Sequence, residues 1–545
     1  MNDLAPDIRT AIDQLLEPSA RSDVPGYAVG VVRHGQLLYR RATGLASIEQ
    51  AVANTPATRM RIASVTKQFT GLAVMLLVED GKLDIDQPVR TVLPELTGLN
   101  GAPTLRQLLN HSGGGRDALD SVAFFLSEGL FPQIPAGLTH QWSSRFTDSN
   151  FAPGEAWCYS NYGYGLLSLL IERASGLSLA DFFQQRLFAP LGMVDSVLWP
   201  NDMELLPGLA TSHIRLPDGR YKRGIYPCEE LVGGGGIVST VDDMLRWAAN
   251  LREQRLGSAA SWAEILRKPR FNNGSEHNYG FGLKCQPHRG VELRWHDGST
   301  FGSKSALLCY PAEGLDIVVL ANRSDSEPGA LGIKIAELLL ADVLGPPKVN
   351  AEAAGREALI GNYYSPALRR VFSIRPQQDK LLFAINATPE GLLRDEDGVL
   401  GNDSSFGPVT VHPSASATAS EIEVETCGRR ETYVRLPDTP PATTALAAEL
   451  VGSYRLADFG TPVRIVCEQD ALVIDLDSRF HPNRIQLKPV SSEVFLCTVT
   501  VLGSPAQGVV TLERRDGAVV GFFFSLQRTW NLHFLRSGMP ESVDL

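Results

Sequence analysis

The chain has 545 residues, of which 43% are hydrophobic and 20% charged, and its formal net charge is −11. That length exceeds a single hydrophobic core and predicts several domains. The acidic charge and the lack of any Lys/Arg-rich run argue against a nucleic-acid partner, because a phosphate backbone binds to a basic surface. The seven cysteines are scattered and form no Cys-x-x-Cys pair, which argues against a disulfide framework or a structural zinc site.

The N-terminal segment MNDLAPDIRTAIDQLLE is acidic and amphipathic, without the basic start and long apolar middle of a secretory signal. The most apolar run, GLAVMLLVEDG, is interrupted by Glu79 and Asp80 before it is long enough to cross a membrane. We therefore expect a cytoplasmic protein without a membrane partner, and the dispersed cysteines fit a reducing compartment.

The first part of the chain has the pattern of an α/β domain. Strand-like residues 30–33 and 37–39 flank a His-Gly turn and predict a hairpin. An apolar period near 3.6 residues predicts a helix from about Val65 to Gly81. Further helices are expected at 105–109, 164–174, 179–191, 241–251 and 332–344, and strands at 279–285, 305–310 and 316–321.

The composition changes after Gly345, where helix signals give way to short alternating strands. The openings LIGNYYS, from Leu359, and LVGSYRL, from Leu450, resemble each other and predict two copies of one β unit, each a small antiparallel barrel. The segment PDTPPATTA, from Pro437, predicts a linker between them. The predicted domains are residues 1–346, 357–437 and 448–545.

Ser64 and Lys67 stand at the start of the predicted helix, in RIASVTKQFT. Their spacing places both side chains on one helix face, and the N–H groups of a helix N-terminus favour negative charge that develops there. A buried lysine can lose its proton and serve as a base. The alternative is a helix cap followed by a solvated lysine, because serine is a favoured N-cap and Ser-x-x-Lys also occurs by chance.

Two later motifs can contribute to the same chemistry. In WCYSNYGY, Tyr159 and Asn161 stand one residue apart before a helix, where a phenol can relay a proton and an amide can orient a lysine. In RWHDGSTFG, a strand edge could present an N–H to an oxyanion, Gly298 would let a substrate approach, and His296 would add a donor. Each motif considered alone has a structural alternative. The first can be an aromatic-rich entry to a helix, and the second an ordinary Asp-Gly turn.

In the order Ser-x-x-Lys, Tyr-x-Asn, His-x-Gly, these motifs resemble those of the serine β-lactamase and penicillin-binding-protein superfamily. TLRQLLNHSGG, PGEAWCYSNYGY, GGGGIVSTVDDMLRW and YGFGL resemble further elements of it, and the likeness covers about Met1 to Leu344. The resemblance implies an α/β (α+β) catalytic domain of the β-lactamase type. A histidine in the third motif, where most β-lactamases have lysine, and two following lipocalin-like β-barrels make the chain most similar to the bacterial D-aminopeptidase family.

The resemblance implies a serine hydrolase that works through an acyl-enzyme, with Ser64 as nucleophile. Either Lys67 as a neutral amine or Tyr159 as a phenolate would take the proton. Asn161 would position Lys67 and the substrate, and His296 would support Tyr159 or bind the substrate. No metal or other cofactor is implied.

The resemblance also implies where a substrate would bind. The backbone N–H groups of Ser64 and Ser299 would form the oxyanion hole. In the D-aminopeptidase family a loop of the last barrel enters the active site, and the equivalent segment here lies near residues 474–484. The residues implied for substrate binding are Asp297, Gly298, Asp475 and Asp477.

The preferred substrate is a short peptide, amide or ester with a free N-terminal D-amino acid, such as D-alanine. Alternatives with the same mechanism are a β-lactamase-like esterase, a D-Ala-D-Ala carboxypeptidase and a β-lactamase. His296 followed by Asp297 disfavours the last two, because both bind a substrate carboxylate and usually have a cation at this motif. A more distant alternative is a catalytically retired binding protein, and the related family suggests a homodimer.

Overall fold

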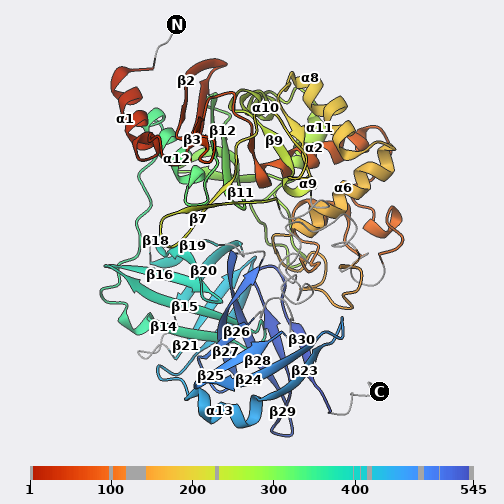
Figure 1. Cartoon of the computed structure of the whole chain (residues 1–545), viewed down its shortest axis with the longest axis vertical. Coiled ribbons are helices and arrows are strands. Elements are labelled where there is room, and N and C mark those ends of the chain that lie inside the picture. Colours follow the sequence, from red (N-terminus) through yellow and green to blue (C-terminus); the bar gives the residue numbers. More distant parts are fainter. Residues whose placement is uncertain are drawn as a thin grey trace.

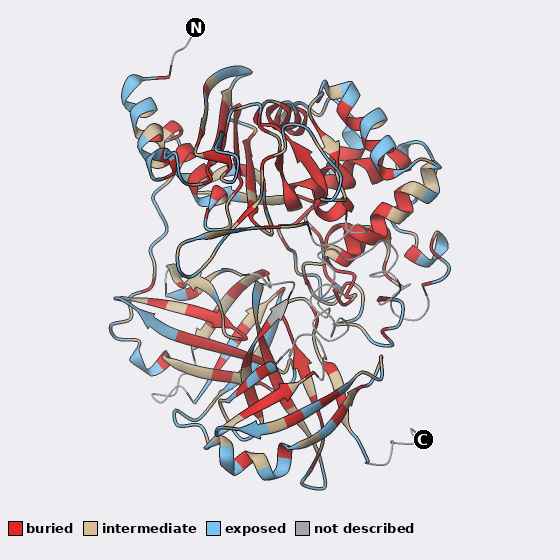
Figure 2. Cartoon of the chain, in the orientation of Figure 1, coloured by how far each residue is buried: buried red, intermediate tan, exposed pale blue. Residues whose placement is uncertain are grey.

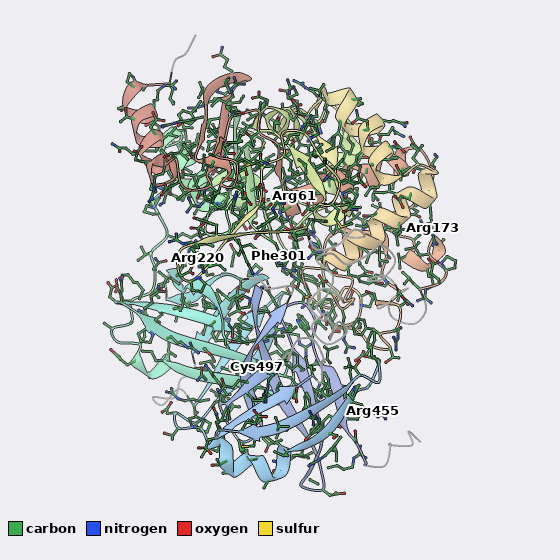
Figure 3. All side chains as sticks on the ribbon, in the orientation of Figure 1. Arg61, Arg173, Arg220, Phe301, Arg455 and Cys497 are labelled. Carbon is green, nitrogen blue, oxygen red and sulfur yellow. The ribbon has the colours of Figure 1, made fainter. Side chains whose placement is uncertain are left out.

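The computed structural model describes residues 4–96, 102–117, 141, 143–226, 232–396, 398–404, 407–413, 420–476, 484–501 and 504–538. A mixed α/β body, formed by the N-terminal part of the chain, lies above two β bodies (Figure 1). Buried residues concentrate in the sheet and inner helices of the first body and inside the two β bodies (Figure 2). Side chains fill these interiors, and the buried Cys497 lies within the last of them (Figure 3). The predicted class, an α/β domain followed by two barrel-like sheets, is confirmed.

An antiparallel sheet with the strand order β10-β11-β12-β13-β1-β2 forms the centre of the first body, so its last strands pair with its first. All of β13 is buried, as expected at the centre of a sheet that is covered on both faces. The predicted hairpin and the predicted strands at 305–310 and 316–321 are confirmed. The strands are β1 (Tyr27–Arg33), β2 (Gln36–Thr43), β10 (Lys284–His288), β11 (Val291–Thr300), β12 (Ser303–Tyr310) and β13 (Leu315–Ala321).

Helices cover both faces of this sheet. α1 (Pro6–Leu16) and α12 (Pro328–Leu339) share one apolar core with the outer face of the strands. α2 (Thr66–Glu79), α6 (Asn161–Ser175) and α10 (Val241–Glu253) share the other core. The shorter helices are α3 (Leu105–Leu109), α7 (Leu179–Phe183), α8 (Ala189–Leu191), α9 (Val232–Gly235) and α11 (Ala259–Ile265), and the shorter strands are β3 (Leu45–Ser47), β4 (Val52–Ala53), β5 (Met60–Arg61), β6 (Val197–Leu198), β7 (His213–Arg215), β8 (Tyr221–Arg223) and β9 (Ile237–Ser239).

Three predicted elements differ from the structure. The helix expected at 179–191 is interrupted by a π-helical turn, Gln184–Phe188, between α7 and α8, and the helix expected at 332–344 ends at Leu339. The strand expected at 279–285 is wrong, because strand β10 begins only at Lys284. Gly282 has a φ of +77°, and a side chain there would meet the Lys67 carbonyl oxygen at 2.4 Å. The segment before β10 is therefore a glycine-bent loop packed on the backbone of α2.

The C-terminal part forms two curled antiparallel sheets, and the second of them closes into a barrel because β23 pairs with β30. The first is nearly closed and has the order β17-β16-β15-β14-β22-β21-β20-β19-β18. Its strands are β14 (Gly361–Ser365), β15 (Arg370–Gln377), β16 (Lys380–Ile385), β17 (Thr388–Leu392), β18 (Arg394–Glu396), β19 (Val399–Ser404), β20 (Gly407–Pro413), β21 (Glu421–Thr426) and β22 (Arg429–Arg435). The barrel has α13 (Thr443–Leu450), β23 (Gly452–Leu456), β24 (Pro462–Glu468), β25 (Ala471–Asp475), β26 (Arg484–Pro489), β27 (Val494–Val501), β28 (Ser504–Arg515), β29 (Ala518–Ser525) and β30 (Leu532–Arg536).

The two similar openings have the same structural role. The Tyr363 hydroxyl donates to the Leu359 carbonyl at 3.0 Å, and the Tyr454 hydroxyl donates to the Leu450 carbonyl at 2.8 Å. In each unit an arginine of the strand that pairs with the opening strand lies over the tyrosine ring. The shared Leu-x-Gly-x-Tyr pattern thus marks the point where each sheet begins. No helix among the described residues has both the length and the apolar character needed to span a bilayer.

Gly282→Ala should destabilise the protein more than a matched glycine substitution. Gly274 has a φ of +84° and open space around it, so Gly274→Ala adds only the backbone strain, about 1 kcal/mol. Gly282→Ala adds the same strain and an overlap with the backbone of α2, for a total of about 3 kcal/mol. Urea unfolding followed by tryptophan fluorescence measures both. Equal losses would contradict the packing of this loop on α2.

Candidate active site

Ser64 lies in a single 3₁₀ turn, Ala63–Val65, that leads directly into α2. The preceding residue, Ala63, has a φ of +47°, a left-handed conformation that costs energy for any residue with a side chain. The turn is held from the sheet, where the Ser305 hydroxyl donates to the Ile62 carbonyl at 2.6 Å. A strained, firmly held turn thus presents the serine at the start of a long buried helix.

Gly298 packs against this same turn. A Cβ on Gly298 would lie 2.2 Å from the Ile62 carbonyl oxygen, 2.5 Å from Ser305 Oγ and 3.0 Å from the Ser64 nitrogen. The requirement for glycine therefore comes from the backbone that carries Ser64. This close packing brings strand β11 to the side of the serine.

Lys67 is completely buried, and its amine nitrogen has three oxygen neighbours. Nζ lies 3.3 Å from Ser64 Oγ, 2.9 Å from Asn161 Oδ1 and 2.7 Å from the Gly234 carbonyl oxygen. Burial holds the pKa of Lys67 well below 10.5. The positive charge of Arg528 lowers this pKa further, while the carboxylates of Asp117 and Asp297 oppose the shift.

Tyr159 lies on the other side of the serine. Lys67 Nζ is 4.7 Å from the centre of the Tyr159 ring, and the phenol oxygen is buried beside the Ser64 hydroxyl. Burial raises the pKa of Tyr159, and the nearby Ser64 hydroxyl and Arg528 offset only part of this. The lysine therefore favours its neutral amine and the tyrosine its neutral phenol.

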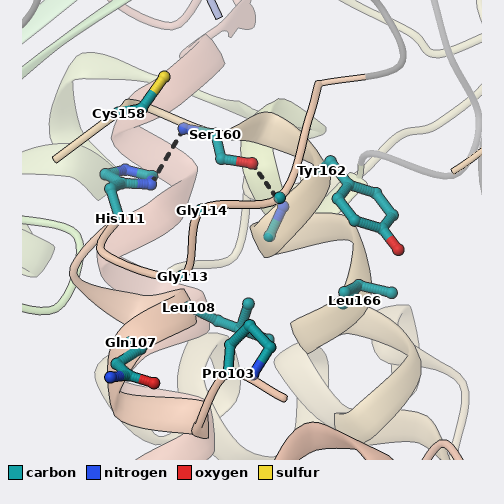
Figure 4. A pocket seen from close by; sticks show the side chains of 12 residues that line it. Pro103, Gln107, Leu108, His111, Gly113, Gly114, Cys158, Ser160, Tyr162 and Leu166 are labelled. Atoms are coloured by element: carbon teal, nitrogen blue, oxygen red, sulfur yellow. Dashed lines mark hydrogen bonds between the residues drawn. The ribbon is translucent and has the colours of Figure 1, made fainter. Parts of the chain in front are cut away.

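Asn161 is the first residue of α6, and two side chains fix this helix end. Ser160 caps the helix by accepting the Gly163 N–H at 3.0 Å, and Asp117 accepts the Asn161 N–H at 3.0 Å. His111 Nδ1 accepts the Ser160 N–H at 3.1 Å, and both residues line a small pocket (Figure 4). The buried His111 thus bridges two loops.

His296 is buried on β11, and both of its ring nitrogens are engaged. Nδ1 donates to the Asp297 carbonyl, which leaves Nε2 to accept the Tyr279 hydroxyl at 2.9 Å. Burial lowers the pKa of His296 to about 3, so the ring is neutral near pH 7. Its ring centre is 6.2 Å from that of Tyr159. The histidine supports the wall of the site together with Tyr279.

Asp297 and Ser299, on either side of Gly298, are exposed on this strand. The Asp297 side chain keeps 50% of its surface and accepts a hydrogen bond from Lys284 at 2.9 Å. Desolvation opposes ionisation of this carboxyl, but Lys284 and His296 outweigh it and bring the pKa of Asp297 to about 2. An ionised carboxylate thus stands beside the Ser64 turn.

Only residues 474–476 and 484 of the segment expected from the last barrel are among the described residues. Asp475 ends β25, and its carboxylate pairs with Arg464 on the neighbouring strand at 3.0 Å. Asp477 lies outside the described residues. Another part of the barrel reaches the site: the turn Leu526–Asn531 between β29 and β30, called the barrel turn below. Its Arg528 guanidinium lies 5.4 Å from the centre of the Tyr159 ring.

Four residues of the site were not assigned from the sequence. Tyr279 and Gly234 stand in YGFGL and in the four-glycine run, which resembled family elements but carried no role. A buried lysine amine needs hydrogen-bond acceptors, and the backbone carbonyls of a glycine run can supply them, so this run was a sequence signal for the acceptor of Lys67. Asp117 and Arg528 stand in no motif and come together only in the folded chain.

Comparisons with known proteins show the family to which the chain belongs. The model of the Beta-lactamase family matches residues 8–342. A D-aminopeptidase of Cereibacter sphaeroides is 26% identical over 521 residues, which is 91% of this chain and 93% of that protein. A D-aminopeptidase of Brucella canis is 30% identical over 357 residues, which is 64% of this chain and 65% of that protein.

Solved structures have the same fold. The octameric penicillin-binding protein homologue from Pyrococcus abyssi has a TM-score of 0.55 at 19% identity and covers 98% of this chain and all of its own. The D-amino acid amidase from Ochrobactrum anthropi SV3, complexed with L-phenylalanine amide, has a TM-score of 0.51 at 26% identity and covers 62% of this chain and 98% of its own. The chain belongs to the Beta-lactamase family and is a serine hydrolase of the β-lactamase fold.

Proposed function

We propose that the protein is an aminopeptidase that releases N-terminal D-amino acids, such as D-alanine, from short peptides, amides or esters. The observation that carries this proposal is the completely buried Lys67 amine 3.3 Å from the Ser64 hydroxyl. A nucleophile with an adjacent base of lowered pKa is the arrangement that acyl transfer needs. The D-amino acid part of the proposal is supported by relatives named D-aminopeptidase and by a related structure named D-amino acid amidase.

The number of hydrogen bonds around Lys67 favours this residue as the base over Tyr159. A neutral amine has two N–H donors and one lone pair. The donors fit Asn161 Oδ1 and the Gly234 carbonyl, and the lone pair is then left to accept the Ser64 O–H. Tyr159, with its raised pKa, holds a proton that it can relay.

The reaction follows from these roles. Ser64 Oγ attacks the substrate carbonyl carbon while its proton passes to Lys67 Nζ. The C–N bond then breaks, and the proton returns through the Tyr159 phenol to the leaving amine. Water attacks the resulting ester, the same groups move its proton, and the amino acid leaves with Ser64 restored.

The oxyanion hole of this proposal uses the N–H groups of Ser64 and Ser299. β10 pairs with β11 only as far as Trp295. Beyond Trp295, the edge of β11 that is not covered by β10 faces the Ser64 turn. A two-residue turn closes the hairpin on the pair Thr300–Ser303. Such turns close on a hydrogen-bonded pair, and pairs alternate along the ladder. The Ser299 N–H is therefore expected to point away from β12, toward Ser64, where it can stabilise negative charge.

The proposed substrate contacts follow from charge and enclosure. Asp297, ionised and half exposed, is the proposed partner of the substrate ammonium, and Gly298 borders the same strand. The barrel turn closes one side of the site. This favours a short substrate and argues against an esterase, for which an open cleft is expected. Asp475 and Asp477 of the last barrel stay candidates for substrate binding.

The proposal also covers the domain boundaries, the oligomeric state and the cellular location of the chain. We propose domains at residues 1–346, 357–437 and 448–545, a homodimer, and a cytoplasmic location. Cys285, Cys309, Cys467 and Cys497 are free thiols, which supports a reducing compartment.

A carboxypeptidase or β-lactamase is the second candidate, and one observation favours it. Arg528 beside Tyr159 supplies, from another domain, a cation that His296 does not supply. Such a cation could bind a substrate carboxylate. Release of D-alanine from D-Ala-D-Ala peptides with a blocked amino end, or hydrolysis of nitrocefin, would favour this candidate over the aminopeptidase.

Purified protein should release p-nitroaniline from D-alanine p-nitroanilide at least about tenfold faster than from the L isomer. Ser64→Ala should abolish the release, because no other group can form the acyl-enzyme. A preference for the L isomer would contradict the D-amino acid assignment. Full activity in Ser64→Ala would contradict the mechanism.

The kcat/KM of this reaction should rise with pH to a plateau reached well below pH 10.5. The free base is the active form of Lys67, its folded-state pKa is lowered by burial, and activity is lost as pH falls through that value. On the alkaline side, kcat/KM should fall from about pH 8, where the α-ammonium of the substrate, the group that Asp297 is proposed to bind, loses its proton. Loss of the Tyr159 phenol proton should contribute only above pH 10, because the pKa of Tyr159 is raised. An acid limb centred near 10.5 would show that Lys67 is not a buried neutral base.

A further inference from the structure

The barrel turn contacts Asn150 of the first body, which donates to the Arg528 carbonyl and accepts the Trp530 N–H, both at 2.8 Å, and two consecutive residues, Arg116 and Asp117. Arg116 is 2% exposed and donates to the carbonyls of Trp530 and Asn531, both at 3.2 Å. It also pairs with Asp458, on the turn before β24, and with Asp148, both at 3.3 Å. A buried arginine with four acceptors from three segments fixes how the barrel docks on the first body.

Asp117 is held by the same turn on both sides of its backbone. The Thr529 hydroxyl donates to the Asp117 carbonyl at 2.7 Å, and the Asp117 N–H donates to the Arg528 carbonyl at 3.4 Å. Thr529 is fully buried and Asp117 is 1% exposed. These contacts fix the position of the Asp117 carboxylate from outside the body that contains Ser64.

The carboxylate then acts on α6. It accepts the Asn161 N–H at 3.0 Å, and the Asn161 side chain accepts from Lys67 Nζ at 2.9 Å. Three hydrogen bonds thus connect Thr529 in the barrel, through Asp117 and Asn161, to Lys67 beside Ser64, and the covalent bonds within Asp117 and Asn161 join one hydrogen bond to the next. Asp117 and Thr529 are 412 positions apart in the sequence, and the Thr529 hydroxyl joins them directly at the domain interface.

We propose that Asp117 is a positioning residue through which the barrel turn holds Asn161 against Lys67, so that the third domain is part of the catalytic apparatus. The inference rests on the proposed function, because it concerns the base of the Ser64 reaction. Asp117 itself touches neither Ser64 nor the substrate in this scheme. Its loss should slow acylation and leave substrate binding almost unchanged.

The test is the rate at which a fluorophosphonate probe labels Ser64, which needs no knowledge of the substrate. Asp117→Ala should slow labelling about ten- to one-hundredfold, because a charge-assisted hydrogen bond is lost. Thr529→Val keeps the side-chain shape and should slow it about three- to tenfold. Asp117→Asn keeps an acceptor oxygen and should recover most of the rate. Arg515→Gln, an exposed change on the same barrel, should have no effect.

The double variant separates a connected path from two independent defects. If Thr529 acts through Asp117, Asp117→Ala with Thr529→Val should be no slower than Asp117→Ala alone. In the peptidase assay, kcat should fall while KM stays within about threefold. If circular dichroism shows that Asp117→Ala does not fold, the rate at which the probe labels Thr529→Val tests the inference instead.

Three results would overturn the inference. Labelling of Asp117→Ala at the wild-type rate would remove the positioning role alone, with the proposed function intact. Additive losses in the double variant would show that Thr529 does not act through Asp117. Wild-type protein that is never labelled at Ser64 would overturn the proposed function, and the positioning role with it.

Discussion

The complete burial of Lys67 is the constraint on which the rest of the site depends. An ammonium in such a place would cost several kcal/mol of solvation, whereas a neutral amine costs much less. The fold therefore selects the neutral form and supplies acceptors for its two N–H groups, Asn161 Oδ1 and the Gly234 carbonyl. What remains is one lone pair directed at the Ser64 hydroxyl. The burial that makes the lysine costly as a cation is the same burial that makes it a base.

Glycines allow the protein to close around this amine. A side chain at Gly282 would come within 2.4 Å of the Lys67 carbonyl oxygen, whereas one at Gly234 would meet Lys67 Nζ at 3.5 Å, an ordinary contact distance. At Gly71, one turn further along α2, a side chain would meet the Phe281 carbonyl at 2.6 Å. The loop that contains Phe281 and Gly282 thus packs on α2 backbone to backbone. Gly71 and Gly282 are required by the close approach of this loop to the helix that carries the buried lysine.

The sequence predicts those parts of the site that are local. Ser64 and Lys67 share a helix face because they are three residues apart, and Tyr159 and Asn161 flank one helix start. Prediction from the sequence fails where a hydrogen-bond partner is distant in the chain and no periodic pattern marks it. The examples are Tyr279 for His296, Gly234 for Lys67, and above all Asp117 for Thr529. The loop before β10 read as a strand because its aromatic residues suit one, and the close approach of α2 overrides that preference. A family resemblance predicted that the last barrel contributes to the site. Residue chemistry could not indicate that the turn after β29 does so.

The docked barrel turn sets two opposite charges near the site, its own Arg528 guanidinium and the Asp117 carboxylate of the residue that it holds. The Arg528 guanidinium lowers the pKa of Lys67 and the Asp117 carboxylate raises it, and both depend on the docking of the barrel through Arg116. His111, Tyr159, Tyr164 and His296 also face the amine, and at neutral pH all four are uncharged. The base therefore takes its electrostatic setting from the interface between two domains as well as from its own helix. A hydrolase built in this way cannot discard the barrel without altering its base, which gives a physical reason for one chain to carry the catalytic domain and the barrel together.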